Sequence, residues 1–291
     1  GYWLLALVMS LFSFFWNAAL PQFEATTLNH LGAETHRYSS IRLWGSIGFI
    51  VAVAGLGSLF ERTGTGILPA VLLVLFAGIW IASLLVPERG TFHPAVDNEP
   101  LRKVLTKPAV VSLLLVCFLI QASHGPYYTF YSLYLAAHDY SETAIGQLWA
   151  LGVVAEIGVF LKMHGWLPRF GARHLLLVAT LLTTLRWILI ALFVDQLWIM
   201  IFAQTLHAAS FGVYHAVAIH LTHQLFTGRH QGRGQALYSS LSFGAGGAVG
   251  SLIAGYLWAG VGAQWMYAAA AATAALAGLI AWRGIERQLQ R

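Results

Sequence analysis

The sequence predicts an all-α membrane protein, built as a polytopic bundle of helices. Hydrophobic residues make up 58% of its 291 residues and charged residues only 9%, whereas about 25% of a typical soluble domain is charged. The apolar residues gather in nine stretches, and each is long enough to cross a bilayer as a helix of about 20 residues. In addition, nearly all of the positively charged residues fall on alternate connections between these stretches.

One long connection divides the nine predicted spans into two groups. The spans cover residues 2–22, 41–60, 66–86, 109–136, 144–163, 174–194, 196–226, 235–259 and 262–282. Residues 87–108 are rich in proline and charge, which is typical of a linker. We therefore expect 1–86 to be the last three helices of an N-terminal bundle and 109–291 to be a complete six-helix C-terminal bundle. Two bundles joined by a basic central linker are the plan of major facilitator transporters.

The positive charges predict the orientation of the chain. Every Lys and Arg lies on a connection that follows an odd-numbered span, except Arg62 and Arg186. Because positive residues stay in the cytoplasm, these connections and the C-terminus are predicted to be cytoplasmic. The net charge of +5 is then an orientation signal, and no nucleic-acid partner is expected.

The predicted orientation has a consequence for the N-terminus of the chain. With nine spans and a cytoplasmic C-terminus, Gly1 would lie outside. We expect that an odd number of spans precedes Gly1 in the natural protein, and the alternative is a nine-span protein with an external N-terminus.

Cys117 is the only cysteine, which excludes a disulfide framework and a cysteine pair for zinc. No cofactor is expected.

Glu156 lies within an otherwise apolar run of the fifth predicted span. An acid at the centre of a membrane helix costs about 2.5–3.5 kcal/mol on insertion scales, and such acids usually face the bundle interior. Helical spacing puts Trp149, Gly152 and Glu156 on one face. An apolar environment disfavours the charged form of a carboxylate, as a proton carrier requires. The alternative is a neutral acid that only joins two helices by a hydrogen bond.

Arg186 lies near the middle of the sixth predicted span and cannot lose its proton. It therefore needs a counter-ion, which is either Glu156 or an anionic substrate, unless it belongs to a permanent structural ion pair. One face of the seventh span carries four polar or aromatic side chains: Gln204, His207, Phe211 and His215. Because histidine titrates near neutral pH, His207 is a second candidate for proton coupling, or else a helix–helix hydrogen bond.

The fourth predicted span contains Gly125-Pro126, which we expect to break the backbone hydrogen-bond ladder in mid-membrane. Such breaks are tolerated where the backbone is buried in protein or lines a cavity. The residues around the break are therefore candidate substrate contacts: Gln121, His124 and Tyr128. Tyr131 and Tyr134 are expected in the aromatic belt at the membrane interface.

The first and eighth spans carry weaker signals. Glu24 is either an intramembrane acid or, if the helix ends at Pro21, a headgroup-level residue. Arg42 opens the second span and either anchors it or pairs with Glu24. Small residues recur at 246, 250 and 254, which favours close helix packing.

Several of these segments together resemble one family. They are RLWGSIGFI (42–50), HGPYYTFYSLY (124–134), IGQLWALGVVAE (145–156), LRW (185–187) and QTLHAASFGVYHAVA (204–218). The chain resembles the phenylpropionate permease branch of the major facilitator superfamily, which is related to galactoside and nucleoside proton symporters. The resemblance covers essentially the whole chain and matches its nine spans to the family's helices four to twelve.

The resemblance also implies roles for particular residues. The related galactoside symporters place an acid, an arginine and a histidine on helices eight, nine and ten. Those positions resemble Glu156, Arg186 and His207 or His215. Their helix ten carries a further acid that this span lacks, so the details of their proton relay do not transfer. The acid–arginine pair of their helices four and five is matched more loosely by Glu24 and Arg42.

The sequence therefore predicts a proton-coupled uptake carrier of the inner membrane, monomeric and not an enzyme. A small organic substrate would bind between the bundles, and the resemblance implies an aromatic carboxylate. Glu156 would carry the proton, with His207 and Glu24 as further candidates. A sugar or nucleoside symporter is the alternative. A metal carrier or metalloenzyme built on His124, His207, His215 and Glu156 is a different class, and the HExxH motif of zinc proteases is absent from the sequence.

Overall fold

The computed structural model describes residues 2–32, 38–63, 65–87 and 100–285, and this part of the chain contains helices and no strand. The helices before the linker are α1 (Tyr2–Leu31), α2 (Tyr38–Thr63) and α3 (Leu68–Leu85), with the 3-10 turn η2 (Thr65–Ile67) before α3. After it come α4 (Leu101–Leu105), α5 (Pro108–Ala136), α6 (Glu142–Phe170), α7 (Ala172–Leu192), α8 (Leu197–Thr205), η3 (Ala208–Val213), α9 (Tyr214–Leu225), η4 (Gly228–His230), α10 (Gln231–Ser239), η5 (Ser240–Gly246), α11 (Gly247–Gly260) and α12 (Ala263–Gly284). The all-α membrane bundle is confirmed.

Seven segments of the described chain are long and apolar enough to cross a membrane. They are Leu68–Leu85, Pro108–Ala136, Thr143–Phe170, Ala172–Leu192, Leu197–Leu225, Gln231–Gly260 and Ala263–Gly284. In α1 and α2 the strongly apolar stretches are shorter, Leu7–Trp16 and Ser40–Ala52, so the count of nine spans stays a prediction. The division at 87–108 also stays a prediction, since residues 88–99 lie outside the described part.

The helix boundaries follow local chemistry. Pro108 stands at the first turn of α5, where the missing amide hydrogen costs nothing. The Ser141 side chain caps α6 by accepting from the backbone N–H of Ala144 at 3.2 Å. Gly171 ends α6 with φ +76° and Gly262 separates α11 from α12 with φ +89°, a conformation that glycine adopts without strain.

The regular helical hydrogen-bond pattern changes in two places that the sequence did not indicate. The spans Leu197–Leu225 and Gln231–Gly260 each contain a π-helical segment, η3 and η5. An extra residue per turn shifts the side chains that follow it, and such bulges are frequent at functional sites. By contrast, Pro126 lies inside α5 and, as expected, interrupts the hydrogen-bond ladder because it has no amide hydrogen, but the helix continues through it.

Gly125 instead serves close packing between α5 and α11. A Cβ on Gly125 would lie 2.3 Å from the Gly250 carbonyl carbon, and one on Gly250 would lie 2.1 Å from the Ala122 carbonyl oxygen. No residue larger than glycine fits at either position without moving backbone. The small residues of the eighth predicted span therefore do form a close packing face.

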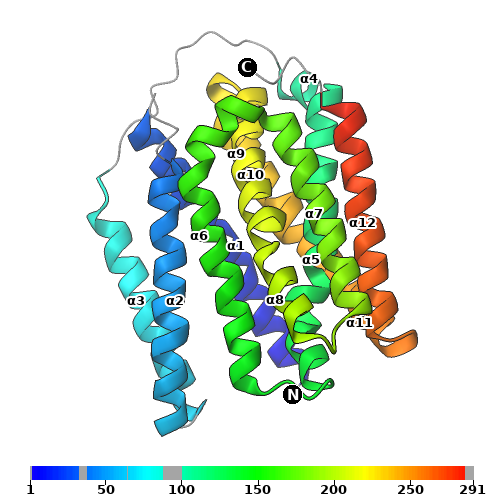
Figure 1. Ribbon diagram of the computed structural model, residues 1–291. Coiled ribbons are helices and arrows are strands. Elements are labelled where there is room, and N and C mark those ends of the chain that lie inside the picture. The colour runs from blue at the N-terminus through cyan, green and yellow to red at the C-terminus, as the bar shows by residue number, and fades with distance from the viewer. Residues whose placement is uncertain (1, 33–37, 64, 88–99, 286–291) are drawn as a thin grey trace.

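Most core residues lie on the helices that follow the linker, and Tyr38 of α2 packs with them. Tyr131 and Tyr134 belong to the core, 0% and 6% exposed, so their expected place in an interfacial belt is wrong. Figure 1 shows α2 and α3 at one side of this bundle, and α2 contacts α6 while α1 contacts α10. We call the end of the bundle where α5 begins and α12 ends the linker end.

Candidate functional site

Arg186 is the centre of a buried polar cluster in the bundle. It lies on α7 and is completely buried. Its Nη2 donates to Gln204 Oε1 at 3.0 Å, and its Nη1 donates to Ser210 Oγ at 3.0 Å and lies 3.0 Å from His207 Nδ1. Each of these partners can be neutral, and among the described residues no carboxylate lies within ion-pair distance of the guanidinium. The cluster thus buries a positive charge without an adjacent anion.

The arginine contact determines which nitrogen of His207 carries the proton. A guanidinium only donates hydrogen bonds, so Nδ1 of His207 must accept and the proton of the neutral ring must be on Nε2. Nε2 lies 3.6 Å from Glu156 Oε2, which is close but longer than a hydrogen bond. His207 therefore stands between Arg186 and Glu156 and faces each with a different nitrogen.

Glycines provide the space that lets Glu156 and His207 approach each other. A Cβ on Gly212 would lie 3.2 Å from Glu156 Cγ, and one on Gly152 would lie 3.3 Å from His207 Cβ. Glu156 is 4% exposed, and its Oε1 accepts a long hydrogen bond of 3.4 Å from Ser46 on α2. The acid therefore contacts both the C-terminal bundle and a helix that precedes the linker.

Aromatic rings form one wall of the cluster. The Arg186 guanidinium lies 4.2 Å from the ring centroid of Tyr127, whose hydroxyl donates to Gln204 Oε1 at 3.2 Å. The ring of Trp149 lies 4.3 Å from that of Tyr127, and its indole N–H donates to Ser132 at 3.0 Å. Tyr128 is next to both rings but is 51% exposed. A guanidinium beside aromatic faces suits a ligand that has both an acid and a ring.

His124 lies beside this wall, with its ring 4.9 Å from that of Trp187. Its Nδ1 is 2.8 Å from the Ile120 carbonyl oxygen and must therefore be the donor, which leaves a bare lone pair on Nε2. That nitrogen and Oε1 of Gln121 are buried without a hydrogen-bond partner. No contact joins Gln121 to Arg186 in the described chain.

A second polar cluster lies nearer the linker end. Glu24 Oε1 accepts from the Tyr38 hydroxyl at 3.1 Å and lies 3.5 Å from His215 Nε2. Gln235 donates to the other carboxylate oxygen, and His215 Nδ1 lies 2.8 Å from the Tyr238 hydroxyl. Glu24 is 4% exposed. Among the described residues, the ion-pair partner of Glu24 is His215, and Glu24 forms no ion pair with Arg42.

Phe211 separates the two clusters. Its ring lies parallel to those of His207 and His215, with centroids 5.6 Å away on each side. The structure thus brings together Glu156, His207, Arg186 and Gln204 as one group, and Glu24 with His215 as another. Sequence reasoning missed Tyr127, Ser210 and Ser46. The spacing of Ser210, three residues after His207, was the one available signal.

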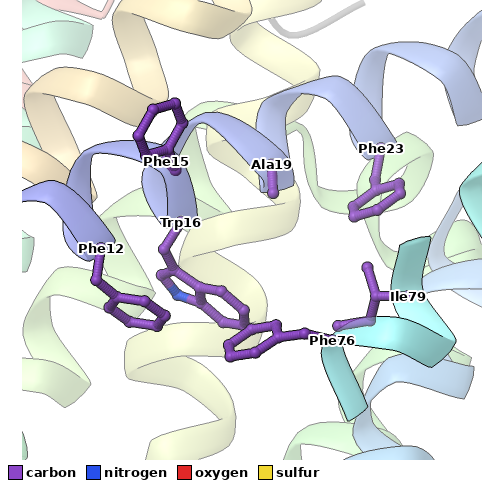
Figure 2. A pocket seen from close by; sticks show the side chains of 7 residues that line it. All are labelled: Phe12, Phe15, Trp16, Ala19, Phe23, Phe76 and Ile79. Atoms are coloured by element: carbon purple, nitrogen blue, oxygen red, sulfur yellow. The ribbon is translucent and has the colours of Figure 1, made fainter. Parts of the chain in front are cut away.

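Neither cluster coincides with the pocket of about 510 Å³ between α1 and α3. Figure 2 shows its lining, in which Phe12, Trp16 and Phe76 turn their rings towards one another. The remaining lining residues are Phe15, Ala19, Phe23 and Ile79. In the part of the chain that the structure describes, no three His, Cys, Asp or Glu side chains are grouped to hold a metal ion.

Comparison with known proteins identifies transporters. The chain is 29% identical over 276 residues to a protein named as a probable 3-phenylpropionic acid transporter of Escherichia coli K12, covering 91% of this chain and 71% of that protein. It is 26% identical over 262 residues to a maltose permease of Geobacillus stearothermophilus, covering 88% of this chain and 65% of the permease. The chain thus spans roughly two thirds of these relatives.

The comparisons also bear on the class of protein. An uncharacterized transporter of Bacillus subtilis is 23% identical over 261 residues, covering 88% of this chain and 64% of the relative. A protein-family model described as the MFS_1 like family matches residues 1–269. These relatives are named as transporters or a permease and not as enzymes. The chain is a member of the MFS_1 like family of the major facilitator superfamily.

Proposed function

We propose that this chain belongs to a proton-coupled uptake carrier for small aromatic carboxylates. The observation that carries the proposal is the environment of Arg186, which is completely buried and has no carboxylate beside it among the described residues. A buried charge without a counter-ion is strongly unfavourable, and a substrate carboxylate would remove that cost. The rings of Tyr127 and Trp149 lie where the aromatic part of such a substrate would pack.

Proton coupling would follow from the two nitrogens of His207. A substrate carboxylate that binds Arg186 Nη1 replaces His207 Nδ1 as the acceptor. The freed Nδ1 can then take a proton, and the resulting imidazolium faces Glu156 Oε2 across 3.6 Å. Because the anion frees a place for the proton, each increases the affinity of the other, as linkage requires.

A sugar substrate is the second candidate. The similarity to a maltose permease favours it, as do the unpaired buried amide groups, Nε2 of Gln204 and Oε1 of Gln121. Unpaired amide groups suit hydrogen bonds to the hydroxyls of a sugar better than contacts with the ring of an aromatic substrate. Against this stands Arg186, since a neutral sugar leaves its charge without a counter-ion.

The remaining features of the proposal follow from the sequence. The positive connections favour a cytoplasmic C-terminus, and the bacterial relatives favour the inner membrane. We propose that the carrier acts as a monomer with its substrate between the bundles, and that binding of proton and substrate shifts the balance between its inward-open and outward-open states.

Uptake into proteoliposomes tests the proposal. The full-length protein is expected to accumulate labelled 3-phenylpropionate when the interior is alkaline, and a protonophore should abolish this. Glu156→Gln should lose accumulation but retain exchange of internal for external substrate. The matched control, Asp139→Asn, changes an exposed acid shortly before the same helix and should behave as wild type.

Three outcomes would contradict the proposal. Accumulation that survives the protonophore excludes proton coupling, and full accumulation by Glu156→Gln excludes a part for this acid in that coupling. Uptake of labelled maltose without uptake of phenylpropionate would replace the carboxylate with a sugar.

A further inference from the structure

His124 of α5 carries an unused hydrogen-bond acceptor inside the bundle. Its side chain is completely buried. Nδ1 lies 2.8 Å from the Ile120 carbonyl oxygen and must donate to it, so the other ring nitrogen, Nε2, has a lone pair and no proton. Nε2 is buried and has no hydrogen-bond partner among the described residues. Because an unsatisfied buried polar atom is costly, this lone pair needs an explanation.

Two simple explanations of the lone pair fail. A proton on Nε2 would make His124 a cation, and the permanent positive charge of Arg186 is near enough to act on the ring, so two buried charges of the same sign would face each other. The nearby indole N–H of Trp187, whose ring centroid lies 4.9 Å from that of His124, already donates to Ser123 at 3.2 Å. Nε2 is therefore an acceptor whose donor is not among these neighbours.

A run of aromatic rings connects Arg186 with this acceptor. The guanidinium lies 4.2 Å from the ring centroid of Tyr127. The ring of Tyr128 lies 5.4 Å from that of Tyr127 and stacks on that of His124 at 5.9 Å. Because Tyr128 is 51% exposed, its ring can turn aside without disturbing the core. A substrate whose carboxylate binds Arg186 and whose ring packs on these tyrosines would therefore point its far edge towards His124.

Gln121 offers a second buried acceptor on the same helix. Its Oε1 also has no hydrogen-bond partner among the described residues, and it lies three residues before His124, one turn earlier on α5. However, Gln121 faces η5, where a Cβ on Gly246 would lie 3.3 Å from the Gln121 Cβ. His124 is the acceptor that contacts the aromatic rings.

We propose that His124 is a specificity-determining residue, whose Nε2 accepts a hydrogen bond from a hydroxyl group on the aromatic ring of the substrate. The preferred substrates are then phenolic carboxylates, ahead of plain phenylpropionate. This inference rests on the proposed function, because Arg186 must hold the carboxylate. A phenol hydroxyl is a neutral donor in the plane of its ring, whereas an ammonium group would be repelled by the positive charge of Arg186.

Competition for uptake tests this inference. Unlabelled phenylpropionate and its ortho, meta and para hydroxy derivatives compete with labelled phenylpropionate for uptake by the full-length protein in proteoliposomes. At least one derivative is expected to compete about tenfold better than phenylpropionate, the effect of satisfying one buried acceptor. His124→Phe removes the acceptor but keeps a ring beside Trp187, and should bind all four compounds about equally. His124→Gln supplies a carbonyl oxygen in place of Nε2 and should keep the preference.

Two further variants separate this effect from general changes in the protein. His174→Phe is the matched control, because His174 also has its Nδ1 beside the carbonyl oxygen four residues earlier, at 3.2 Å, but is exposed. It should show the wild-type preference. Gln121→Leu removes the other unpaired acceptor of α5 and should also keep the preference for the hydroxyl.

The outcomes distinguish this inference from the proposed function. Equal competition by all four compounds in the wild type would overturn the role of His124, as expected if water alone satisfies Nε2, and would leave the carboxylate carrier intact. Loss of the preference in Gln121→Leu but not in His124→Phe would also overturn it. If neither phenylpropionate nor any derivative is taken up, the proposed function itself fails, and the inference fails with it.

Discussion

Two glutamate–histidine pairs lie along this bundle, and they differ in their third partner. His207, which faces Glu156, lies against Arg186, a permanent cation. His215, which faces Glu24, lies against the hydroxyl of Tyr238. An arginine can only donate, whereas a hydroxyl can donate or accept. A second proton on His207 must therefore displace Arg186, while one on His215 only requires the Tyr238 hydroxyl to rotate.

The pairs also differ in the elements that they join. Glu156 and His207 both belong to helices after the linker, so their separation is fixed by packing within one bundle. Glu24 and His215 belong to different predicted bundles, so their separation changes whenever the bundles move. The same two residue types thus form one pair within a single predicted bundle and another pair between the two predicted bundles. The four predictions that follow test this distinction, from the largest expected effect to the smallest.

Replacing Arg186 should have the largest effect. Arg186→Gln removes the charge that would bind the substrate carboxylate, and we expect carboxylate uptake to fall about 100-fold, because hydrogen bonds to charged groups contribute about 1.5–3 kcal/mol. Arg186→Lys keeps the charge but not the fork that reaches Gln204 and Ser210 together, and should lose about tenfold. Initial rates of labelled uptake measure both. Equal, wild-type rates in the two variants would remove Arg186 from the substrate site.

The second prediction exchanges the two histidines for phenylalanine one at a time. His207→Phe should lower proton-driven accumulation relative to exchange about tenfold, within the usual range of coupling free energies. His215→Phe should leave this ratio unchanged, because His215 lies against Tyr238 and Glu24 and not against Arg186. Both variants keep the parallel ring stack with Phe211. Measuring accumulation and exchange on the same vesicles gives the ratio, and a reversed pattern would interchange the roles of the pairs.

Tyr127 tests the aromatic wall beside the first pair. Tyr127→Phe removes only the hydroxyl that donates to Gln204, and should weaken substrate affinity about fivefold, as for one hydrogen bond. Tyr127→Leu also removes the ring under Arg186 and should lose more, about tenfold, since a desolvated cation–π contact contributes up to roughly 2 kcal/mol. Competition by unlabelled phenylpropionate measures affinity. If the leucine variant bound better than the phenylalanine variant, the ring would have no role in holding Arg186.

Much of this arrangement was predictable from sequence, because intramembrane polar residues are rare. Glu156, Arg186 and His207 stand out in apolar surroundings, and their helical spacing already placed each on an inward face. The all-α bundle followed from apolar stretches of the length that a bilayer requires. These inferences needed only the composition of the sequence and the helical spacing of its polar residues.

Other features depend on tertiary contacts and could not be read from the sequence. Tyr127 looks like any aromatic in a run of tyrosines, and only the position of α7 puts Arg186 over its ring. Gly125-Pro126 predicts an interrupted hydrogen-bond ladder, but only the position of α11 shows that Gly125 serves close packing. The pairing of Glu24 with His215 instead of Arg42 depends on how α1 meets α9 and α10, which no local pattern encodes.

Ser46 should give the smallest effect and the finest test of the comparison. Ser46 lies on α2, and its hydroxyl donates to Glu156 across 3.4 Å. In the described chain, this is the one hydrogen bond that joins a helix before the linker to the Glu156–His207 pair. Because the bond is long and therefore weak, Ser46→Ala should lower proton-driven accumulation only about twofold, with exchange unchanged. Ser40→Ala, at an exposed position of the same helix, is the control.

A larger loss in Ser46→Ala than in His207→Phe would contradict the distinction between the pairs. It would mean that Glu156 depends more on a helix from the other predicted bundle than on its histidine, and that the first pair also senses separation of the bundles. We expect only a twofold loss because the contact with His207 sets the position of Glu156, whereas the contact with Ser46 only adjusts it.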